Sequence, residues 1–222
     1  EDRLQNIASL ADNITLAGQQ LEELTNRLEE LSQQLRNSRT NVLFAIEQQL
    51  KDTLADLGMP GAVIRIEMEK LDNFSDSGKD KVRFLFSANQ GQEPRPVSKV
   101  ASGGEISRLM LAVKSLISHR NMIPVIVFDE IDSGVSGSIA GRTGQVMLRM
   151  AMNMQVIVIT HIPQIAARGQ HHFFVYKETR EGNTQSAIKE LNAEERVRVI
   201  AGMLSNQNIT TAATEAAKQL LQ

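Results

Sequence analysis

The chain has 222 residues, a formal net charge of −2 and no cysteine. The absence of cysteine excludes disulfides and thiolate metal sites, and the small net charge excludes a globally basic surface for nucleic acid. No apolar run approaches the roughly 20 residues that span a bilayer, so we expect no membrane partner. Hydrophobic residues make up 41% of the chain and aromatic residues 4%, which favours an aliphatic α/β core with long helices. Because the chain begins with Glu1 and enters a helical pattern at once, we expect it to be a piece of a longer protein.

A heptad pattern predicts one long helix over residues 1–57. The seam consists of Ile7, Leu10, Ile14, Ala17, Leu21, Leu24, Leu28, Leu31 and Leu35, and after Ser38 it slips to Leu43, Ile46, Leu50, Leu54 and Leu57. Such a slip changes the supercoil locally, as a stutter does. A helix of this length would be roughly 80 Å long. A bundle helix is the alternative, but the length and strict repeat favour a coiled coil whose partner is not evident in this sequence.

The remaining residues, 58–222, alternate strand and helix patterns. Gly58, Pro60 and Gly61 end the first helix, and the next run predicts a hairpin with a polar turn at Asn73–Asp80. The predicted elements are strands at Ala62–Met68 and Val82–Ser87, a loop at Asn89–Pro96, a helix at 104–119, a strand at Val125–Phe128, a helix at Ile139–Met152, a strand at Gln155–Thr160, strands near Phe173–Lys177 and Ser186–Leu191, and helices at Ala193–Leu204 and Thr211–Leu221. The two central apolar strands with a helix between them predict a βαβ unit with a buried parallel sheet.

Two carboxylates, Asp129 and Glu130, follow the apolar strand Val125–Phe128. Open α/β sheets bind ligands beyond the carboxyl ends of their strands. A carboxylate at that position can hold Mg²⁺, and a second one can orient or deprotonate a water that attacks a γ-phosphate. The shorter Asp129 comes first and suits the metal, whereas Glu130 reaches further and suits the water. A helix cap or surface turn after a strand is the alternative interpretation.

The run Ser102-Gly103-Gly104-Glu105 precedes the helix predicted at 104–119. A serine followed three residues later by glutamate is a capping box, which explains Ser102 and Glu105 but not the two glycines. Glycine in a helix costs about 1 kcal/mol relative to alanine. Since a helix N-terminus binds anions, the glycines indicate that a phosphate approaches this backbone closely.

Thr160-His161 ends the strand that we expect beside Val125–Phe128, so His161 should face the same crevice. A partly exposed loop histidine is the alternative. His171 and His172 are adjacent, and we assign them structural roles. The phosphate-loop pattern G-x-x-x-x-G-K-[ST] does not occur, because Ser77-Gly78-Lys79-Asp80 lacks both the first glycine and the final hydroxyl. The chain therefore lacks a phosphate cradle of its own.

Three runs together carry a resemblance to a known family. They are Lys99–Arg108 (KVASGGEISR), Phe128–Gly137 (FDEIDSGVSG) and Thr160–Ala167 (THIPQIAA). These runs resemble the RecN family of bacterial DNA-repair ATPases, which are related to the structural-maintenance-of-chromosomes (SMC) proteins. The resemblance is strong over about residues 97–221, extends in layout over 60–96, and covers 1–57 only as a coiled coil. The first run resembles the ABC signature motif, with Ala101 replacing the usual leucine and Glu105 replacing the glutamine of transporters.

The resemblance implies an α/β fold: the C-terminal lobe of an ABC-type ATPase head over 58–222, with a mainly parallel sheet and flanking helices, carried on the returning arm of a coiled coil over 1–57. Two such heads would enclose two ATP molecules with Mg²⁺. Asp129, Glu130 and the switch histidine His161 would serve one nucleotide. Ser102, Gly103, Gly104 and Glu105 would cap the nucleotide of the opposite head, and Asp132 would lie in the D-loop that crosses between subunits.

The implied partners are an N-terminal lobe with the phosphate cradle, the outgoing arm, a second copy of the head, and DNA. The implied location is the cytoplasm, at the nucleoid. A transporter head is disfavoured by the heptad arm, and the head of another chromosome protein by the His-x-Pro-Gln run. A structural tether with an inactive ATPase is a further alternative, which the intact Asp129, Glu130 and His161 disfavour.

Overall fold

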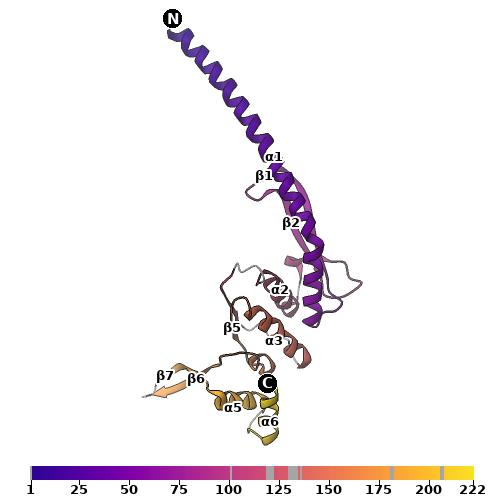
Figure 1. The fold of residues 1–222 in the computed structure, drawn as a ribbon, viewed down its shortest axis with the longest axis vertical. Coiled ribbons are helices and arrows are strands. Elements are labelled where there is room, and N and C mark those ends of the chain that lie inside the picture. Colours follow the sequence, from indigo (N-terminus) through magenta and orange to yellow (C-terminus); the bar gives the residue numbers. More distant parts are fainter. Residues whose placement is uncertain are drawn as a thin grey trace. The chain divides into compact units, whose positions relative to one another are not determined.

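The computed structural model describes residues 2–100, 102–118, 123–129, 135, 137–180, 183–205 and 208–222, with side chains in the first helix described from Leu10 onward. The elements are α1 (Asp2–Asp56), β1 (Val63–Ser75), β2 (Gly78–Ser87), β3 (Arg95–Pro96), the 3-10 turn η1 (Val97–Lys99), α2 (Gly103–Ser118), β4 (Val125–Asp129), α3 (Gly137–Ala151), β5 (Gln155–Ile159), α4 (Pro163–Ala166), β6 (Phe173–Arg180), β7 (Asn183–Glu190), α5 (Ala193–Leu204) and α6 (Thr211–Leu220) (Figure 1).

The chain divides into two compact units. One contains residues up to Glu47 together with Arg65–Leu85, and the other contains Gln48–Ile64 together with Phe86–Gln222. The helix α1 and the strands β1 and β2 contribute to both units. The division expected from the sequence, an arm over 1–57 and a lobe over 58–222, stays a prediction.

Helix α1 is continuous over 55 residues, as the heptad pattern predicts. Its apolar seam is exposed: the exposed fractions of Leu21, Leu24, Leu28 and Leu31 are 68%, 63%, 48% and 44%. We call the exposed set the leucine stripe, and it consists of Leu10, Ile14, Leu21, Leu24, Leu28, Leu31, Leu35 and Val42. These positions repeat at heptad spacing, so the stripe is one continuous apolar face that the described part of the chain leaves open.

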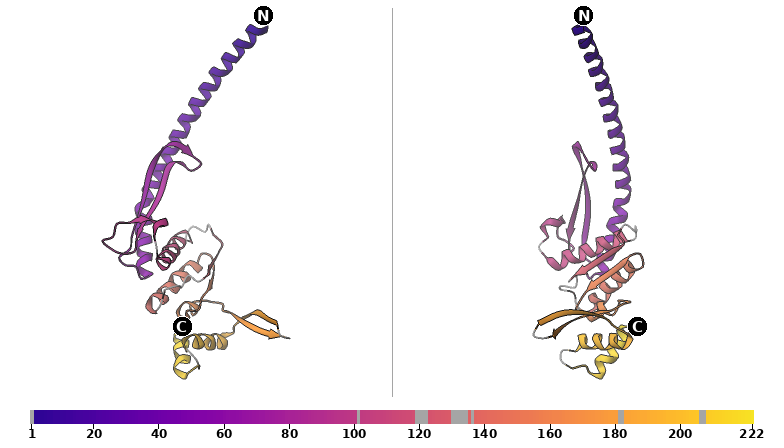
Figure 2. Two further views of the ribbon diagram at one scale, coloured as in Figure 1. Left: turned by 180° about the vertical axis from the view of Figure 1, so that it is seen from behind. Right: turned by 90° about the vertical axis from the view of Figure 1, so that its left-hand side faces the viewer.

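The strands β1 and β2 form a hairpin with a two-residue turn, Asp76–Ser77, and β3 extends the same sheet (Figure 2). The predicted polar turn over Asn73–Asp80 is therefore too long. Lys79 and Asp80 are polar because they contact α1: the Lys79 Nζ lies 2.6 Å from a Glu29 carboxylate oxygen, and Asp80 is an ion-pair partner of Arg36. Further along the hairpin, the Ile66 amide donates to the Glu47 carboxylate at 2.6 Å. The polar side chains of β2 therefore pair with polar side chains of α1, whereas the sequence pattern indicates a turn exposed to solvent.

The second unit contains a parallel strand pair, β4 and β5, whose register runs from Val125 opposite Gln155 to Asp129 opposite Ile159. The strands and the intervening α3 confirm the predicted βαβ order. One face of β4 is buried through Ile126 and Phe128. The other face of the pair is exposed, with Val127 at 54% and Ile159 at 56%, so the prediction of a fully buried sheet is wrong. The described elements cover one face of the pair only.

The C-terminal part contains an antiparallel hairpin and two helices. Strand β6 pairs with β7 from Phe173 opposite Glu190 to Arg180 opposite Asn183. Helix α5 begins with a capping box in which Asn192 and Glu195 bond reciprocally, and α6 begins at the cap Thr210. The helices α5 and α6 share a buried cluster with the end of α4, formed by Ala167, Ile200, Ala201 and Ala217. Among the described residues, no helix is both long and apolar enough to cross a membrane.

Candidate functional site

The carboxyl ends of β4 and β5 lie at the same edge of their sheet. Because Asp129 is opposite Ile159 in a parallel register, the residues that follow Ile159 continue beside the end of β4. The side chains of Asp129 and His161 are both exposed there. The structure thus brings Asp129 and the Thr160–His161 segment to one edge, as the sequence predicts. Glu130 and Asp132 lie outside the described residues.

Local hydrogen bonds hold the segment that carries His161. The Thr160 hydroxyl accepts from the Ile162 amide at 3.0 Å, and the Ile162 carbonyl accepts from the amides of Ile165 and Ala166 at 3.1 and 3.0 Å. His161 therefore lies between a side-chain turn and the short helix α4. Sequence reasoning missed α4, although Pro163 at its first position is a helix-start signal.

The signature run begins α2. Ser102 is exposed, its carbonyl accepts from the Ile106 amide at 3.1 Å, and Glu105 lies in the first turn. A side chain added at Gly103 would meet no atom within 4 Å. The packing of the described chain therefore gives no reason for glycine at this position, despite its cost in a helix. A ligand that approaches the backbone from outside would give one.

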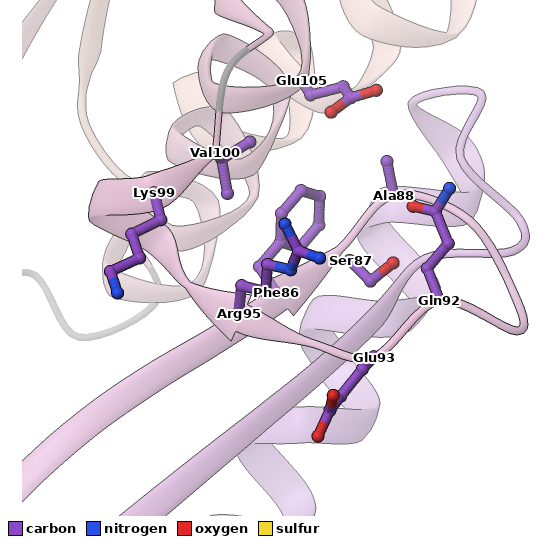
Figure 3. A pocket seen from close by; sticks show the side chains of 9 residues that line it. All are labelled: Phe86, Ser87, Ala88, Gln92, Glu93, Arg95, Lys99, Val100 and Glu105. Carbon is purple, nitrogen blue, oxygen red and sulfur yellow. The ribbon is translucent and has the colours of Figure 1, made fainter.

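A cavity of about 430 Å³ lies beside the start of α2 (Figure 3). Its lining combines the end of β2, the β3–η1 segment and the signature glutamate, and consists of Phe86, Ser87, Ala88, Gln92, Glu93, Arg95, Lys99, Val100 and Glu105. Figure 3 shows the Phe86 ring at its centre, with the Lys99 and Glu93 side chains directed outward. Glu105 also lines a second cavity of about 280 Å³ together with Arg108. The sequence pattern assigns Gln92, Glu93 and Arg95 to a loop and does not predict either cavity.

A cation–π contact joins α2 to β4. The Lys114 Nζ lies 5.1 Å from the centroid of the Phe128 ring, which is almost fully buried. The distance is within the range in which a ring attracts a cation. Helix α2, which starts at the signature run, is thereby linked to the strand that ends in Asp129.

The two adjacent histidines have local partners. His171 Nδ1 lies 3.1 Å from a Glu190 carboxylate oxygen, and His172 Nε2 lies 3.2 Å from the Gly169 carbonyl. Burial, and then the neighbouring Arg196 guanidinium, lower the pKa of His172. These contacts agree with the structural roles that we assign to both residues.

Asp129 offers the donor type that Mg²⁺ prefers. It is an exposed carboxylate at the tip of a strand, and Mg²⁺ in nucleotide sites is bound through one or two carboxylates, with waters and phosphate oxygens completing the shell. Within the described ranges, no three acidic, histidine or cysteine side chains gather into a metal cluster. The carboxylate of Asp129 therefore fits Mg²⁺ by its donor chemistry.

Comparison of the sequence with curated proteins finds DNA repair proteins named RecN. The chain is 38% identical to RecN of Xylella fastidiosa (strain 9a5c) over 193 residues, which cover 86% of this chain and 35% of that protein. It is 36% identical to RecN of Haemophilus influenzae over 84% of this chain and 34% of that protein, and 32% identical to RecN of Vibrio cholerae over 98% and 40%. The chain thus spans well under half the length of these relatives. No protein-family model matches it.

Comparison with solved structures finds heads of SMC proteins. The Smc head domain with a coiled coil and joint from Pyrococcus yayanosii aligns with a TM-score of 0.60 at 22% identity, over 80% of this chain and 32% of that one. The Pyrococcus furiosus Smc head bound to the C-terminal domain of ScpA aligns with a TM-score of 0.58 at 21% identity, over 83% and 44%. These likenesses show the fold of an SMC-type head. Over the part of RecN that it spans, the chain belongs to the RecN family of DNA repair proteins.

Proposed function

We propose that this chain is the C-terminal lobe of the ATP-hydrolysing head of a RecN-like protein that acts in recombinational repair of DNA double-strand breaks. The observation that carries the proposal is the parallel register of β4 and β5, in which Asp129 is opposite Ile159. That register brings the Asp129 carboxylate and the His161 segment to one sheet edge. Open α/β sheets bind nucleotides at such edges.

Asp129, Glu130 and His161 have separate roles in the proposal. Asp129 holds Mg²⁺, which when bound neutralises charge on the β- and γ-phosphates of ATP. Glu130 follows directly in the sequence, orients the attacking water and accepts its proton. His161 contacts the γ-phosphate and responds to its loss.

The start of α2 serves the nucleotide of a second head. Ser102 and Gly103 are exposed at the helix N-terminus, where free amide groups favour anions. The open space around Gly103 supports an approach of phosphate from outside this chain. Two heads would then close on two ATP molecules, each nucleotide lying between the Asp129 edge of one head and the Ser102 run of the other. Asp132 belongs to the loop that crosses between them.

Two exposed apolar faces support the view that further parts of the protein pack here. The open face of the β4–β5 pair, with Val127 and Ile159, suits an N-terminal lobe that also supplies the missing phosphate cradle. The leucine stripe of α1 suits the outgoing arm of the coiled coil. DNA would contact surfaces that the complete protein assembles, in the cytoplasm at the nucleoid.

Two substitutions at consecutive residues, Asp129 and Glu130, test the proposal in the full-length protein. Glu130→Gln keeps the shape of the side chain and removes the base, so we expect ATP binding to persist, turnover to fall by about 10²–10⁴-fold and the heads to stay closed on ATP. Asp129→Asn should weaken the Mg²⁺ site and lower turnover without trapping a closed dimer. Turnover, nucleotide affinity and dimer lifetime of the two variants separate these roles.

Two results would contradict the proposal. Hydrolysis by Glu130→Gln at the parent rate would exclude Glu130 as the catalytic carboxylate. A full-length parent protein that binds ATP without hydrolysing it would instead indicate a structural tether.

A further inference from the structure

Helix α4 packs against α3 at Gly144. A Cβ atom at this position would lie 3.0 Å from Arg168 Cγ, 3.2 Å from the Gln164 carbonyl oxygen and 3.5 Å from Ile165 Cα. The first contact is with a flexible side chain that can move. The second is with backbone of α4, at a separation tighter than ordinary van der Waals contact. A side chain at this position would therefore require the backbone of α4 to shift away from α3 by a few tenths of an ångström.

The position of α4 determines the position of His161. Two residues separate His161 from Gln164, and the Ile162 carbonyl that starts α4 accepts from the amides of Ile165 and Ala166. Ile165 is almost fully buried, so α4 has little freedom to turn. A displacement at Gln164 and Ile165 must pass along this bonded segment to His161.

The N-terminus of α3 follows, in the sequence, the residues that come after β4. Helix α3 begins at Gly137, directly after the run 130–136 that contains Glu130 and Asp132 in the sequence. It therefore connects the residues that follow β4 with the residues that follow β5. Helix α3 thus follows β4 in the sequence and packs against α4, which follows β5.

We propose that Gly144 is a positioning residue for His161, which acts by letting α4 seat against α3. The proposal rests on the proposed function, in which His161 contacts the γ-phosphate. Because glycine has no side chain, α4 can pack close to α3, and this packing holds His161 in the position that hydrolysis requires. Because Gly144 is buried inside the lobe and has no side chain to contact a ligand, nucleotide binding should not depend on it.

The chain offers a matched control for this residue. Gly141 lies one turn earlier on α3, and a Cβ atom there would meet nothing within 4 Å. Replacement by alanine brings the same gain in helix propensity at both positions. The two alanine variants therefore differ in the contact with α4 and share the effect on the helix.

The first experiment measures hydrolysis in the full-length protein. Gly144→Ala should lower turnover at saturating ATP by about 10- to 100-fold, the scale expected when a catalytic group is misplaced by a fraction of an ångström to 1 Å. ATP affinity should stay at the parent value, and Gly141→Ala should match the parent in both. Parent-like turnover of Gly144→Ala would overturn the proposal.

The second experiment is independent of hydrolysis. In the 222-residue chain, the imidazole NMR resonances of His161, assigned with His161→Gln, should shift in Gly144→Ala and remain unchanged in Gly141→Ala. Unchanged His161 resonances in Gly144→Ala would refute the positioning role even if the proposed ATPase function holds. Conversely, a full-length parent protein that does not hydrolyse ATP would contradict the proposed function. The His161 resonances of Gly144→Ala would still show whether Gly144 affects the position of His161.

A milder variant covers the case in which Gly144→Ala does not fold. Ile165→Val removes one buried methyl group from α4 and leaves Gly144 in place. Thermal unfolding of the 222-residue chain establishes that each variant is folded. The same shift of the His161 resonances is expected in Ile165→Val, and its absence would count against the proposal.

Discussion

Arg36 on α1 forms an ion pair with Asp80 on β2, with 2.5 Å between Nη1 and Oδ1, and the Asp80 side chain is only 2% exposed. A second arginine, Arg39, approaches the other carboxylate oxygen at 3.6 Å and donates to the Ser77 carbonyl at 2.9 Å. The buried acid thus fastens the tip of the hairpin to the helix. The stripe residue Leu35 lies on the same side of α1 as Arg39, one turn earlier, and a Cβ atom added at Gly78 of the hairpin would lie only 3.2 Å from Leu35 Cδ2. The tip of the hairpin therefore adjoins the leucine stripe at Leu35.

Replacement of Asp80 should loosen the hairpin from α1. Asp80→Asn leaves two arginines without their charged acceptor, and hydrogen bonds to charged groups contribute about 1.5–3 kcal/mol each. We expect the free energy of local opening of the hairpin to fall by about that amount. Hydrogen exchange of the β1 and β2 amides measures it directly.

The exposed turn residue Asp76 provides the control for this change. Asp76→Asn removes a charge from the same hairpin, and an exposed substitution of this kind usually alters stability by less than about 0.5 kcal/mol. Equal exchange rates in Asp80→Asn and Asp76→Asn would show that the ion pair does not hold the hairpin.

The 222-residue chain by itself should bind ATP poorly and should not hydrolyse it. The reason is the missing phosphate cradle, since the P-loop backbone and lysine supply the main contacts to the β- and γ-phosphates in such ATPases. Calorimetry with Mg-ATP tests the affinity, and adding the N-terminal lobe should restore turnover. Micromolar affinity of the isolated chain would contradict the assignment of the cradle to another part of the protein.

Ser102→Arg should block ATP-dependent dimerisation of the heads without unfolding the lobe. The long side chain would occupy the space that the opposite γ-phosphate must enter, whereas loss of a serine cap costs a helix only about 1 kcal/mol. Size measurement of the full-length variant with ATP shows whether dimers form, and circular dichroism shows that the lobe is folded. An ATP-dependent dimer of parent size would exclude a signature role for Ser102.

Local periodicity predicts the helices well. The heptad repeat of α1 and the apolar periodicity of α2, α3, α5 and α6 are each encoded within a few consecutive residues, and the bounds of these helices lie within two residues of those predicted. The edge position of Asp129 and His161 also follows from short-range pattern, because a βαβ unit brings the carboxyl ends of its strands together.

Features that depend on distant residues were not predictable. Lys79 and Asp80 have the polarity of a turn, and only their contacts with Glu29 and Arg36 show that they belong to a strand. The apolar runs of β4 and β5 indicate two buried faces, but the described chain covers one of them. The close contact at Gly144 has no sequence signal, because a glycine inside a helix pattern gives no indication of what lies against it.

The leucine stripe should make the 222-residue chain self-associate in solution. A continuous apolar face of this length on an isolated helix is unfavourable in water, and a heptad repeat pairs readily with a second helix. The double variant Leu21→Glu, Leu28→Glu places two charges on the seam, both at position a of the heptad, and should convert the associated species to monomer.

The control is the double variant Gln19→Glu, Asn26→Glu. It adds the same charge at the same spacing, but each substitution lies two residues before a seam leucine and therefore off the seam, so association should be unchanged. Sedimentation at several concentrations measures the mass of each variant. A parent chain that is monomeric at every concentration, with slowly exchanging amides over residues 10–35, would show that the stripe needs no partner and would overturn the coiled-coil interpretation of α1.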